Sequence, residues 1–491
     1  MYEARKKILW FAIGSRVAII ILQFIFNTLC PDHDSDSFRS PVDDTANVSS
    51  FDVLITFVFR GLTRWDGEYF THIAEYGYTY ENTLAFYPLF PLIVRAIAIC
   101  LKSIFFMLNI HSCVIIASIL LNFICFVKSA VVFYDLSVFV LKRSNIAYKA
   151  AVLYCINPAS IFFSAVYTES LFAYLTFYSM LASLKLDPYV AFPLALSILV
   201  RSNGIVNLGF PVYSHIKNLS HTFITKYSFS SRMFVRFMFS AGTLRNCSSL
   251  LNTIVITLAP FFLLQIYNYI TFCVSHSNET APPLHVINYA IINNLVLQGN
   301  GNAEWCNSSL PLAYSYVQKK YWNVGFLKYY EFKQIPNFGL ALPILCIMTI
   351  CVKEYVNEHK SYFCSLGFSE SVTEAKSQDV KKYPKEILVF VVHGLFLTIF
   401  CVFFIHIQVS TRLLCSASPL LYWYCALTMS QEESCKYANK KTRSNLQYYL
   451  QLTLSLLPMR QFSLVDKLIL SYFIAYTIIG CFMFSNFLPW T

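Results

Sequence analysis

The feature that most constrains this chain is a series of apolar stretches, each near or above the length needed to cross a bilayer. They lie at 17–29, 111–141, 250–274, 387–405 and 465–487. A helix of about 20 apolar residues spans the hydrocarbon core. The chain is 56% hydrophobic and only 13% charged, whereas a soluble domain has roughly 25% charged residues. We therefore predict an all-α polytopic membrane protein with roughly ten membrane helical segments, which excludes an ordinary soluble fold.

Charge predicts how the chain is oriented in the membrane. The basic start MYEARKK precedes the first apolar segment, 8–29, and indicates an uncleaved signal anchor with its N-terminus in the cytoplasm. The next segment, 30–85, is then the first luminal loop. Its acids before the second apolar stretch are Asp32, Asp34, Asp36, Asp43 and Asp44. It also contains a glycosylation sequon at Asn47, which is useful only in a lumen.

Later segments extend this topology within a single membrane domain, 1–491. Residues 213–249 form a basic cytoplasmic loop with Lys217, Lys226, Arg232, Arg236 and Arg245 but no acid. We predict that its sequons at Asn218 and Asn246 are unmodified. Residues 275–335 form a second large luminal loop, with sequons at Asn278 and Asn307. The net charge of +11 indicates orientation in the membrane, not nucleic-acid binding.

Four further crossings follow, and two earlier segments remain ambiguous. The crossings are expected at 336–352, 387–405, 411–428 and 464–487. Residues 86–108 form either a short span or an interfacial helix. Residues 188–212 have the polar sequence Arg201-Ser202-Asn203-Gly204 at their centre, which a membrane tolerates only where the chain faces protein or a water-filled cavity. This pattern favours a half-spanning hairpin.

The cysteines show no metal-binding pattern. There are 16, many inside apolar stretches, and none forms a CxxC pair. Most are interpreted as small buried apolar residues. A luminal disulfide involving Cys30, Cys273 or Cys306 stays open as an alternative. We expect no metal site, because the acidic pattern from Asp32 to Asp36 lies in a loop that we expect to be flexible.

The stretch RWDGEYF, 64–70, follows a short apolar segment, 51–63, that suits a helix on the membrane surface. Asp66 would then lie at the water boundary beside Trp65, an aromatic residue that favours this depth. A carboxylate there can act as a general base on a lipid-borne substrate. The alternative is a helix cap or a partner for Arg60 or Arg64.

Several polar residues lie inside or beside apolar segments. Arg16 is interpreted as snorkelling to the head groups. Glu169 is either a helix cap at a luminal turn or a substrate contact. Arg201 and Arg412 either bind phosphate oxygens, which suit the planar guanidinium fork, or pair with distant carboxylates. His406 and Gln408 can add hydrogen bonds beside Arg412, and His72 is interpreted as a packing residue. A transporter would also place acids and arginines in its spans.

A series of ordered sequence blocks resembles the GPI mannosyltransferase II family, the PIG-V type. The blocks are SRVAIIILQFIFNTLCPDHDSDSF (15–38), RWD (64–66) with HIAEYGYTYENTLAFYPLFP (72–91), NPASIFFSAVYTESLF (157–172), RSNGIVNLGF (201–210), YWNVGFLKYYEFKQIPNF (321–338), HIQVSTRLLCSASPLLYW (406–423) and NFLPWT (486–491). The resemblance extends from near residue 5 to the last residue and is weak near 214–248, 353–385 and 429–462.

The resemblance implies the GT-C glycosyltransferase architecture, a place in the endoplasmic reticulum membrane and an acidic residue in the first luminal loop. It implies transfer of the second, α1,6-linked mannose of the GPI core from dolichyl-phosphate mannose to a mannosyl-glucosaminyl-phosphatidylinositol. Both partners are membrane lipids. A small membrane subunit is a further candidate partner. No nucleic acid and no cofactor beyond the donor lipid are expected.

The chemistry of that reaction predicts roles for particular residues. A β-linked donor and an α-linked product require inversion, with one base to take the proton of the acceptor hydroxyl. We assign Asp66 as this base. Cationic groups stabilise the leaving phosphate. The predicted substrate contacts are Arg64, Trp65, Glu68, Glu169, Arg201, Trp322 and Arg412. Tyr69 and Tyr329 are further candidates for stacking on sugars.

Three other readings stay open. One is a different dolichol-linked GT-C mannosyltransferase, against which the block at 321–338 argues. Another is a lipid transporter or scramblase. The third is a non-catalytic subunit of a glycosylating complex.

Overall fold

The computed structural model describes residues 2–43, 47–226, 237–275, 282–301, 303–368, 381–429 and 463–490. Within these ranges the regular elements are helices, and the extended pairing is a single antiparallel bridge between Tyr80 and Leu297. This confirms the predicted all-α fold. The sequon residue Asn278 and the basic loop residues Arg232 and Arg236 lie outside the described ranges.

Six of the described helices are long and apolar enough to cross a membrane. They are α1 (Tyr2–Leu29), α5 (Ile110–Leu141), α11 (Ala241–Cys273), α14 (Ile335–Glu358), α16 (Leu388–Phe403) and α20 (Leu464–Ser485). The α5 helix has 32 residues and is therefore about 48 Å long at 1.5 Å per residue. That length exceeds the roughly 30 Å hydrocarbon core of a bilayer. The prediction of a polytopic membrane protein is confirmed.

Shorter helices complete the bundle. They are α6 (Ser144–Cys155), α7 (Glu169–Leu184), α8 (Ala191–Val200), α9 (Gly209–Lys226), α17 (Ser410–Ala417) and α18 (Leu420–Thr428). The central helix, α5, packs against α1, α4, α6 and α7. The sequence predicts one return segment over 411–428, but the structure divides it into α17 and α18 at Pro419. Proline lacks a backbone N–H and cannot continue the helical hydrogen-bond pattern.

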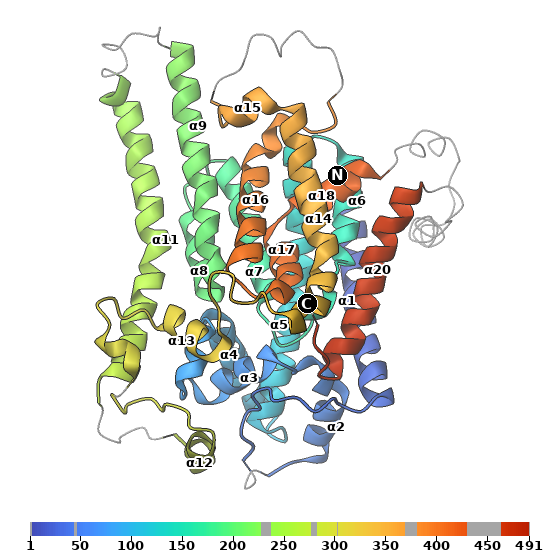
Figure 1. Cartoon of the computed structure of the whole chain (residues 1–491), viewed down its shortest axis with the longest axis vertical. Coiled ribbons are helices and arrows are strands. Elements are labelled where there is room, and N and C mark those ends of the chain that lie inside the picture. The colour runs from blue at the N-terminus through green and yellow to red at the C-terminus, as the bar shows by residue number, and fades with distance from the viewer. Residues whose placement is uncertain are drawn as a thin grey trace.

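The connecting elements lie at opposite ends of the bundle (Figure 1). The lower end in that view holds α2 (Ser50–Phe59), α3 (Asp66–Tyr76), α4 (Leu89–Ile104), α12 (Leu284–Ile292) and α13 (Ala313–Trp322). The upper end holds α15 (Lys360–Cys364) and the loop ends of α9 and α11. Elements from 30–85 and 275–335 therefore share the lower end.

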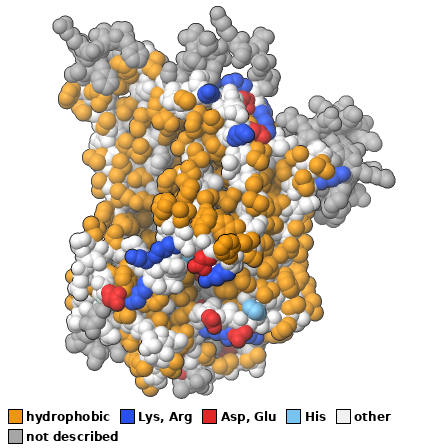
Figure 2. Space-filling view, in the orientation of Figure 1, with side chains coloured by type: hydrophobic (Ala, Val, Ile, Leu, Met, Phe, Trp, Pro, Cys, Tyr) orange, Lys and Arg blue, Asp and Glu red, His pale blue; other side chains and the backbone are white. Residues whose placement is uncertain are grey.

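The surface agrees with a membrane-spanning bundle. Figure 2 shows a broad hydrophobic surface between charged side chains near the upper end and a second belt of charged side chains in the lower half. The long helix α11 contributes exposed apolar side chains to the protein surface, among them Leu251, Val255, Phe262, Leu263 and Ile266. Burying this apolar area in lipid is favourable, at roughly 25 cal/mol per Å².

Helices α8 and α9 form a hairpin. Six residues connect the end of α7 to the start of α8, and Arg201 at the far end of α8 pairs with Glu169 at the start of α7. The chain then reverses through a 3-10 turn, Ser202–Leu208, into α9. Gly204 lies so close to α8 that an added Cβ would be 2.6 Å from the Ser197 carbonyl. The structure therefore contains the predicted hairpin, and its half-spanning position in the membrane stays a prediction.

The ambiguous segment 86–108 forms α4, which has 16 residues, whereas each of the six candidate membrane spans has at least 19 when the turns leading into α14 and α16 are included. Its buried side is Phe90, Pro91, Val94 and Ala98, and it packs on α3 and α5. Arg95, Leu92 and Ile99 are exposed on the other side. This division into two faces, together with its place at the lower end, is typical of an interfacial helix.

Arg16 corrects the sequence-based expectation of snorkelling, because it is fully buried inside the bundle. Its guanidinium donates to the backbone carbonyls of Cys155 at 3.0 Å and Ser160 at 2.8 Å, and lies 3.8 Å from the ring centre of Phe126. Helix α6 ends at Cys155, and the last carbonyls of a helix lack partners within it and carry partial negative charge. Arg16 therefore joins α1 to the end of α6.

Replacing Arg16 by methionine is expected to lower the free energy of unfolding by about 2–4 kcal/mol, because buried carbonyls lose their donors. Thermal unfolding in detergent measures the change. The matched control is Arg5→Gln on the same helix, where the Arg5 side chain is 48% exposed and pairs with Asp135. Such an exposed pair contributes about 1 kcal/mol or less. Equal effects of the two variants would contradict the structural role of Arg16.

Candidate active site

The candidate site is built around an ion pair between Asp66 and Arg412, which are 346 positions apart in the sequence. Asp66 is the first residue of α3, and Arg412 lies in the first turn of α17. Nη1 of Arg412 donates to Oδ2 of Asp66 at 2.7 Å. The guanidinium carbon lies 5.5 Å from the ring centre of Phe162 and 5.6 Å from that of Tyr167. Long-range packing thus brings a carboxylate and a guanidinium together at the start of α3.

Both members of this pair keep groups that a ligand can use. The side chain of Asp66 is 28% exposed and that of Arg412 is 19% exposed. Among the described residues, Oδ1 of Asp66 has no hydrogen-bond partner. Within the same residues, the guanidinium of Arg412 makes a single hydrogen bond, which it donates to Oδ2 of Asp66. One carboxylate oxygen can therefore accept a proton, and several guanidinium N–H groups can bind an anion.

The backbone before α3 is held in an unusual conformation. Trp65 has φ 58° and ψ −123°, a region that residues with a side chain rarely adopt and that costs about 1–3 kcal/mol. The surrounding contacts stabilise it. The Asp66 N–H donates to the Tyr167 hydroxyl at 3.0 Å, and the Leu62 carbonyl accepts from the Val166 N–H at 2.9 Å. These contacts orient the start of α3 towards the segment before α7.

Trp65 lies next to Asp66 in the chain and packs against the C-terminal segment. Its ring packs edge to face on Phe487 near the C-terminus, with ring centres 5.8 Å apart. Its indole N–H is buried and has no partner in the described part of the chain. The Trp-Asp pair therefore divides its roles, with Trp65 against the C-terminal segment and Asp66 against Arg412.

A second acid–arginine pair lies near the first. Glu169, the first residue of α7, is fully buried and pairs with Nη1 of Arg201. The charge of Glu169 also acts on Arg412. The other carboxylate oxygen of Glu169, Oε2, is buried without a hydrogen-bond partner among the described residues. Two arginines and two acids thus gather between α3, α7, α8 and α17.

Helix α13 covers this group from the second lower-end loop. The Tyr314 hydroxyl on α13 is within 2.9 Å of the Ser202 hydroxyl, and the charges of Arg201 and Arg412 both act on it. Burial raises the pKa of Tyr314, so the hydroxyl stays protonated. At the other end of α13, the ring centre of Trp322 is 5.9 Å from that of Tyr69.

Glu81 fixes α13 in this position. It is fully buried, accepts from Nζ of Lys320 at 2.9 Å and from the Tyr321 hydroxyl at 2.7 Å. The Glu81 N–H also donates to the Val296 carbonyl at 2.9 Å. The two lower-end loops therefore pack together through a buried, charge-assisted contact.

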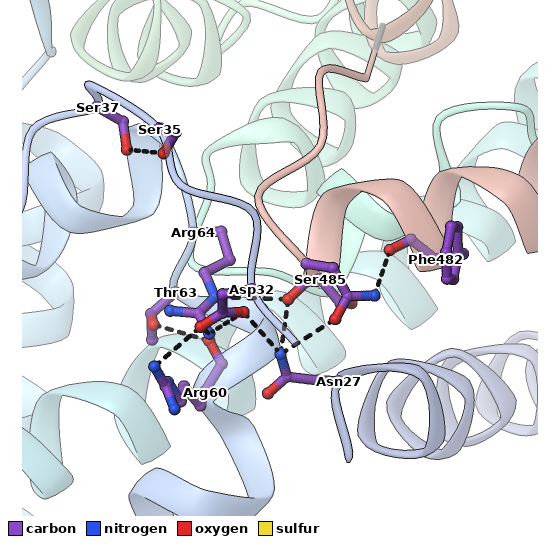
Figure 3. A network of polar contacts seen from close by, with 10 residues as sticks. Asn27, Asp32, Ser35, Ser37, Arg60, Thr63, Arg64, Phe482 and Ser485 are labelled. Carbon is purple, nitrogen blue, oxygen red and sulfur yellow. Dashed lines mark hydrogen bonds and ion pairs between the residues drawn. The ribbon is translucent and has the colours of Figure 1, made fainter. Parts of the chain in front are cut away.

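Arg64 does not join the pair of arginines near Asp66. It is 4% exposed and donates through Nη2 to both oxygens of Asp32, at 2.8 and 2.6 Å (Figure 3). Arg60 pairs with the same carboxylate at 2.8 Å, and Asn27 donates to it at 3.2 Å. Burial lowers the pKa of Arg64 to about 10, against the opposing effect of Asp32, which leaves the group charged at neutral pH. Asp32 therefore holds Arg60 and Arg64 in place, which corrects the expectation that it lies in a flexible loop.

Glu68, also in the first turn of α3, forms a separate group with its neighbours. The Ser40 N–H donates to Glu68 at 3.2 Å, and burial raises the pKa of Glu68. His72 lies within 2.7 Å of the Thr79 hydroxyl and within 3.1 Å of the Ser40 hydroxyl. Burial lowers the pKa of His72 to about 3, so it stays neutral. This agrees with a packing role for His72.

Tyr69 is not available for stacking on a sugar, because both faces of its ring are covered. Phe38 stacks on it with ring centres 4.2 Å apart, and Phe86 stacks with ring centres 4.5 Å apart. Trp322 is half-buried and contacts Tyr69 at a tilt and Phe86 edge to face, so neither of these rings stacks on its face.

Sequence reasoning missed Tyr167 and Tyr314 as site residues. Tyr167 lies within the block NPASIFFSAVYTESLF, so its position near Glu169 was a usable signal. Asn122 holds this segment by donating to the carbonyls of Ala165 at 2.6 Å and Tyr167 at 2.8 Å. Tyr314 carries no comparable signal, because only the packing of α13 brings it near Arg201.

Cys273 and Cys306 form the disulfide that the sequence left unassigned. It closes the second lower-end loop, with a sequence separation of 33. Replacing both cysteines by serine is expected to destabilise the fold by about 3–4 kcal/mol in the chain-entropy model. We expect faster limited proteolysis between α11 and α13, and a lower thermal midpoint. The control is Cys364→Ser, a free exposed cysteine of α15; an equal loss there would contradict the prediction.

The predicted glycosylation sites at Asn47 and Asn307 are exposed at the ends of elements near the lower end, and Asn278 lies outside the described residues. Asn246 on α11, which we predict to be unmodified, contacts the ring of His215 on α9. Among the described residues, no three His, Cys, Asp or Glu side chains gather as a metal site. The expectation of a metal-free site stays a prediction.

Comparison with known proteins assigns the chain to a protein family. A family model described as mannosyltransferase (PIG-V) matches residues 5–491. GPI alpha-1,6-mannosyltransferase 2 of Cricetulus griseus is 35% identical over 99% of both chains. GPI mannosyltransferase 2 of Drosophila melanogaster is 34% identical over 99% of this chain and 100% of its own. The Homo sapiens GPI alpha-1,6-mannosyltransferase 2 is 34% identical over 99% of both. The chain therefore belongs to the PIG-V mannosyltransferase family.

Proposed function

We propose that this protein transfers the second, α1,6-linked mannose of the GPI core from dolichyl-phosphate mannose to a mannosyl-glucosaminyl-phosphatidylinositol in the endoplasmic reticulum membrane. Membership of a mannosyltransferase family and whole-length relatives named as GPI mannosyltransferases support it. The observation that carries the chemistry is the Asp66–Arg412 pair, which combines an open carboxylate oxygen with open guanidinium donors.

In this proposal Asp66 is the general base of a single inverting displacement. Oδ1 takes the proton of the acceptor 6-hydroxyl as that oxygen attacks the anomeric carbon. The bond from the anomeric carbon to the phosphate oxygen breaks on the opposite face of the sugar. The hydrogen bond from Arg412 holds Oδ2 and so aims Oδ1 away from the guanidinium. The proton stays on Asp66 until the product has left.

Arg412 is proposed to stabilise the leaving group. Dolichyl phosphate gains a negative charge as the bond breaks, and a preorganised cation near that oxygen lowers the barrier. Arg201 is the second proposed contact, since it lies beside Glu169 in the same group of charges. Arg64 is a weaker candidate for this role, because Asp32 already binds it on both oxygens.

We further propose that the lower end faces the lumen. Disulfides persist in oxidising compartments and are rare in the cytosol, so the Cys273–Cys306 bond supports this orientation. In sealed microsomes, a membrane-impermeant maleimide should label Cys364 near α15 at the upper end. Cys273 and Cys306 should react only after the membrane is permeabilised and the disulfide reduced. Labelling of Cys306 in sealed, reduced vesicles would overturn the orientation.

The reaction itself is tested by supplying radiolabelled dolichyl-phosphate mannose and a synthetic one-mannose GPI precursor to purified protein in detergent. A product bearing two mannoses, with the new linkage α1,6, is expected. Removal of the protein from cells should accumulate the precursor with one mannose. A different mannosylated lipid would indicate another dolichol-linked mannosyltransferase. Lipid movement between leaflets without sugar transfer would indicate a scramblase.

A further inference from the structure

A cluster of neutral polar side chains lies between the start of α14 and the start of α17. The Tyr329 hydroxyl donates to Oε1 of Gln334 at 2.7 Å, and lies 3.0 Å from Oε1 of Gln408. The Asn337 amide donates to the Tyr329 hydroxyl at 2.8 Å and to Gln334 at 2.7 Å. We call Tyr329, Gln334, Asn337 and Gln408 the amide cluster.

These contacts hold the amide cluster in place and leave some of its polar atoms available for a ligand. Each of its side chains is half-buried. Among the described residues, Nε2 of Gln334, Nε2 of Gln408 and Oδ1 of Asn337 make no hydrogen bond, and none of these atoms is sealed from the surface. The cluster therefore presents two amide donors and one carbonyl acceptor, all held in place by a shared tyrosine hydroxyl.

One side of the amide cluster leads directly to the candidate active site. Gln408 lies four residues before Arg412, across the junction of a 3-10 turn with α17. Arg412 in turn binds Asp66. Gln408 therefore joins the cluster to the segment that carries Arg412, so that a ligand seated on the cluster is placed relative to the ion pair.

The other side leads back to α3 through aromatic residues. The ring of His406 stacks on Tyr329 with centres 4.5 Å apart, and His406 also contacts the backbone of Trp322. Trp322 packs against Tyr69, which lies one turn after Asp66 on α3. A series of contacts therefore joins the amide cluster to α3 as well as to α17, the two helices that carry Asp66 and Arg412.

We propose that the amide cluster binds the hydroxyl groups of a mannosyl head group, and that it positions this sugar against Asp66. The proposal rests on the proposed function, because it takes the reactants to be mannosyl lipids. Neutral amide donors and acceptors near the half-buried indole of Trp322 match the chemistry of a pyranose, which is uncharged, rich in hydroxyls and apolar on its C–H faces. The charged pairs nearby match the phosphate.

Both lipid substrates carry mannose, so binding is measured for each lipid alone, where no transfer takes place. Full-length protein in nanodiscs is titrated with the donor or with the one-mannose precursor. Gln408→Met keeps the size of the side chain and removes its amide. We expect this variant to raise Kd about fivefold to tenfold for one of the two lipids, as the loss of a neutral hydrogen bond predicts, and to leave Kd for the other unchanged.

A second set of titrations uses mono-deoxy analogues of the affected lipid. Removal of the hydroxyl that contacts Gln408 should weaken binding to the wild type by a similar factor and have no further effect on Gln408→Met. Additive losses for every deoxy analogue would overturn the proposal and indicate a purely structural role. So would an equal rise in Kd for both lipids, or no rise for either.

Tyr330→Phe is the matched control, because the Tyr330 hydroxyl donates to the Val402 carbonyl at 2.8 Å and joins the same segment to α16. It should leave both Kd values unchanged. These binding data are independent of the transfer assay. Wild-type protein that binds mannosyl lipids through the amide cluster but forms a different product would overturn the proposed function alone.

Discussion

Replacing Asp66 by asparagine is expected to reduce kcat for mannose transfer by about 10²–10⁴-fold, which is the usual contribution of a positioned general base. Asparagine has nearly the same size, and its amide oxygen can still accept from Arg412. The backbone N–H of residue 66 keeps its bond to the Tyr167 hydroxyl. We therefore expect normal thermal stability and nearly unchanged KM for both lipids. The measurement is the initial rate with radiolabelled donor in detergent.

The matched control for this variant is Asp36→Asn, an exposed aspartate of the same lower-end segment. It should retain full activity. In cells that lack the protein, wild type and Asp36→Asn should restore GPI-anchored proteins at the surface, and Asp66→Asn should not. Equal rescue by Asp66→Asn would show that Asp66 is not the base. Rescue by all three variants together with absent transfer in vitro would indicate a non-catalytic subunit.

Replacing Arg412 by glutamine is the second change with a large expected effect, a loss of about 10²–10³-fold in kcat, by analogy with the removal of one preorganised donor to a developing anion. The variant also releases Oδ2 of Asp66 from its hydrogen bond at 2.7 Å. Arg412→Lys separates the two effects. Lysine keeps a positive charge beside Asp66 but lacks the planar fork, so we expect an intermediate loss with a raised KM for the donor.

Arg95→Gln on α4 is the control for Arg412, because Arg95 is exposed at the same end of the bundle. Its kcat and donor KM should match the wild type. A dolichyl-phosphate competitor offers a further readout that does not depend on turnover. Its affinity should fall in Arg412→Gln and stay constant in Asp66→Asn. Unchanged affinity in Arg412→Gln would show that Arg412 contacts no phosphate.

Much of the fold followed from local patterns. Apolar length predicted α1, α5, α11, α14, α16 and α20, because a bilayer imposes the same length and apolarity on any spanning helix. The polar break after Val200 predicted the turn between α8 and α9. The division of 411–428 at Pro419 carried a local signal too, and apolar composition outweighed it in the sequence-based reading.

The partners of the charged residues were harder to predict. From the sequence, Arg16 was interpreted as snorkelling and Arg64 as a substrate contact. Asp66 was assigned as the base, and the alternative was a helix cap or a pair with Arg60 or Arg64. In the structure Arg16 binds carbonyls at the end of α6, and Arg64 binds Asp32. Each outcome depends on which helix end or loop packs nearby. Local sequence contains no information on that choice, because the partner lies 139 residues away for Arg16 and 32 residues away for Arg64.

The sequence alone determined that this chain spans a membrane, that a Trp-Asp pair follows its first long apolar segment, and that its ordered blocks resemble one glycosyltransferase family. Hydrophobic length and residue order are properties of the chain itself. Only the tertiary structure selected Arg412 for Asp66 and Arg201 for Glu169 from 37 basic and 26 acidic residues. The physical reason is that an ion pair needs contact within a few ångströms, and helix packing decides which distant side chains come that close.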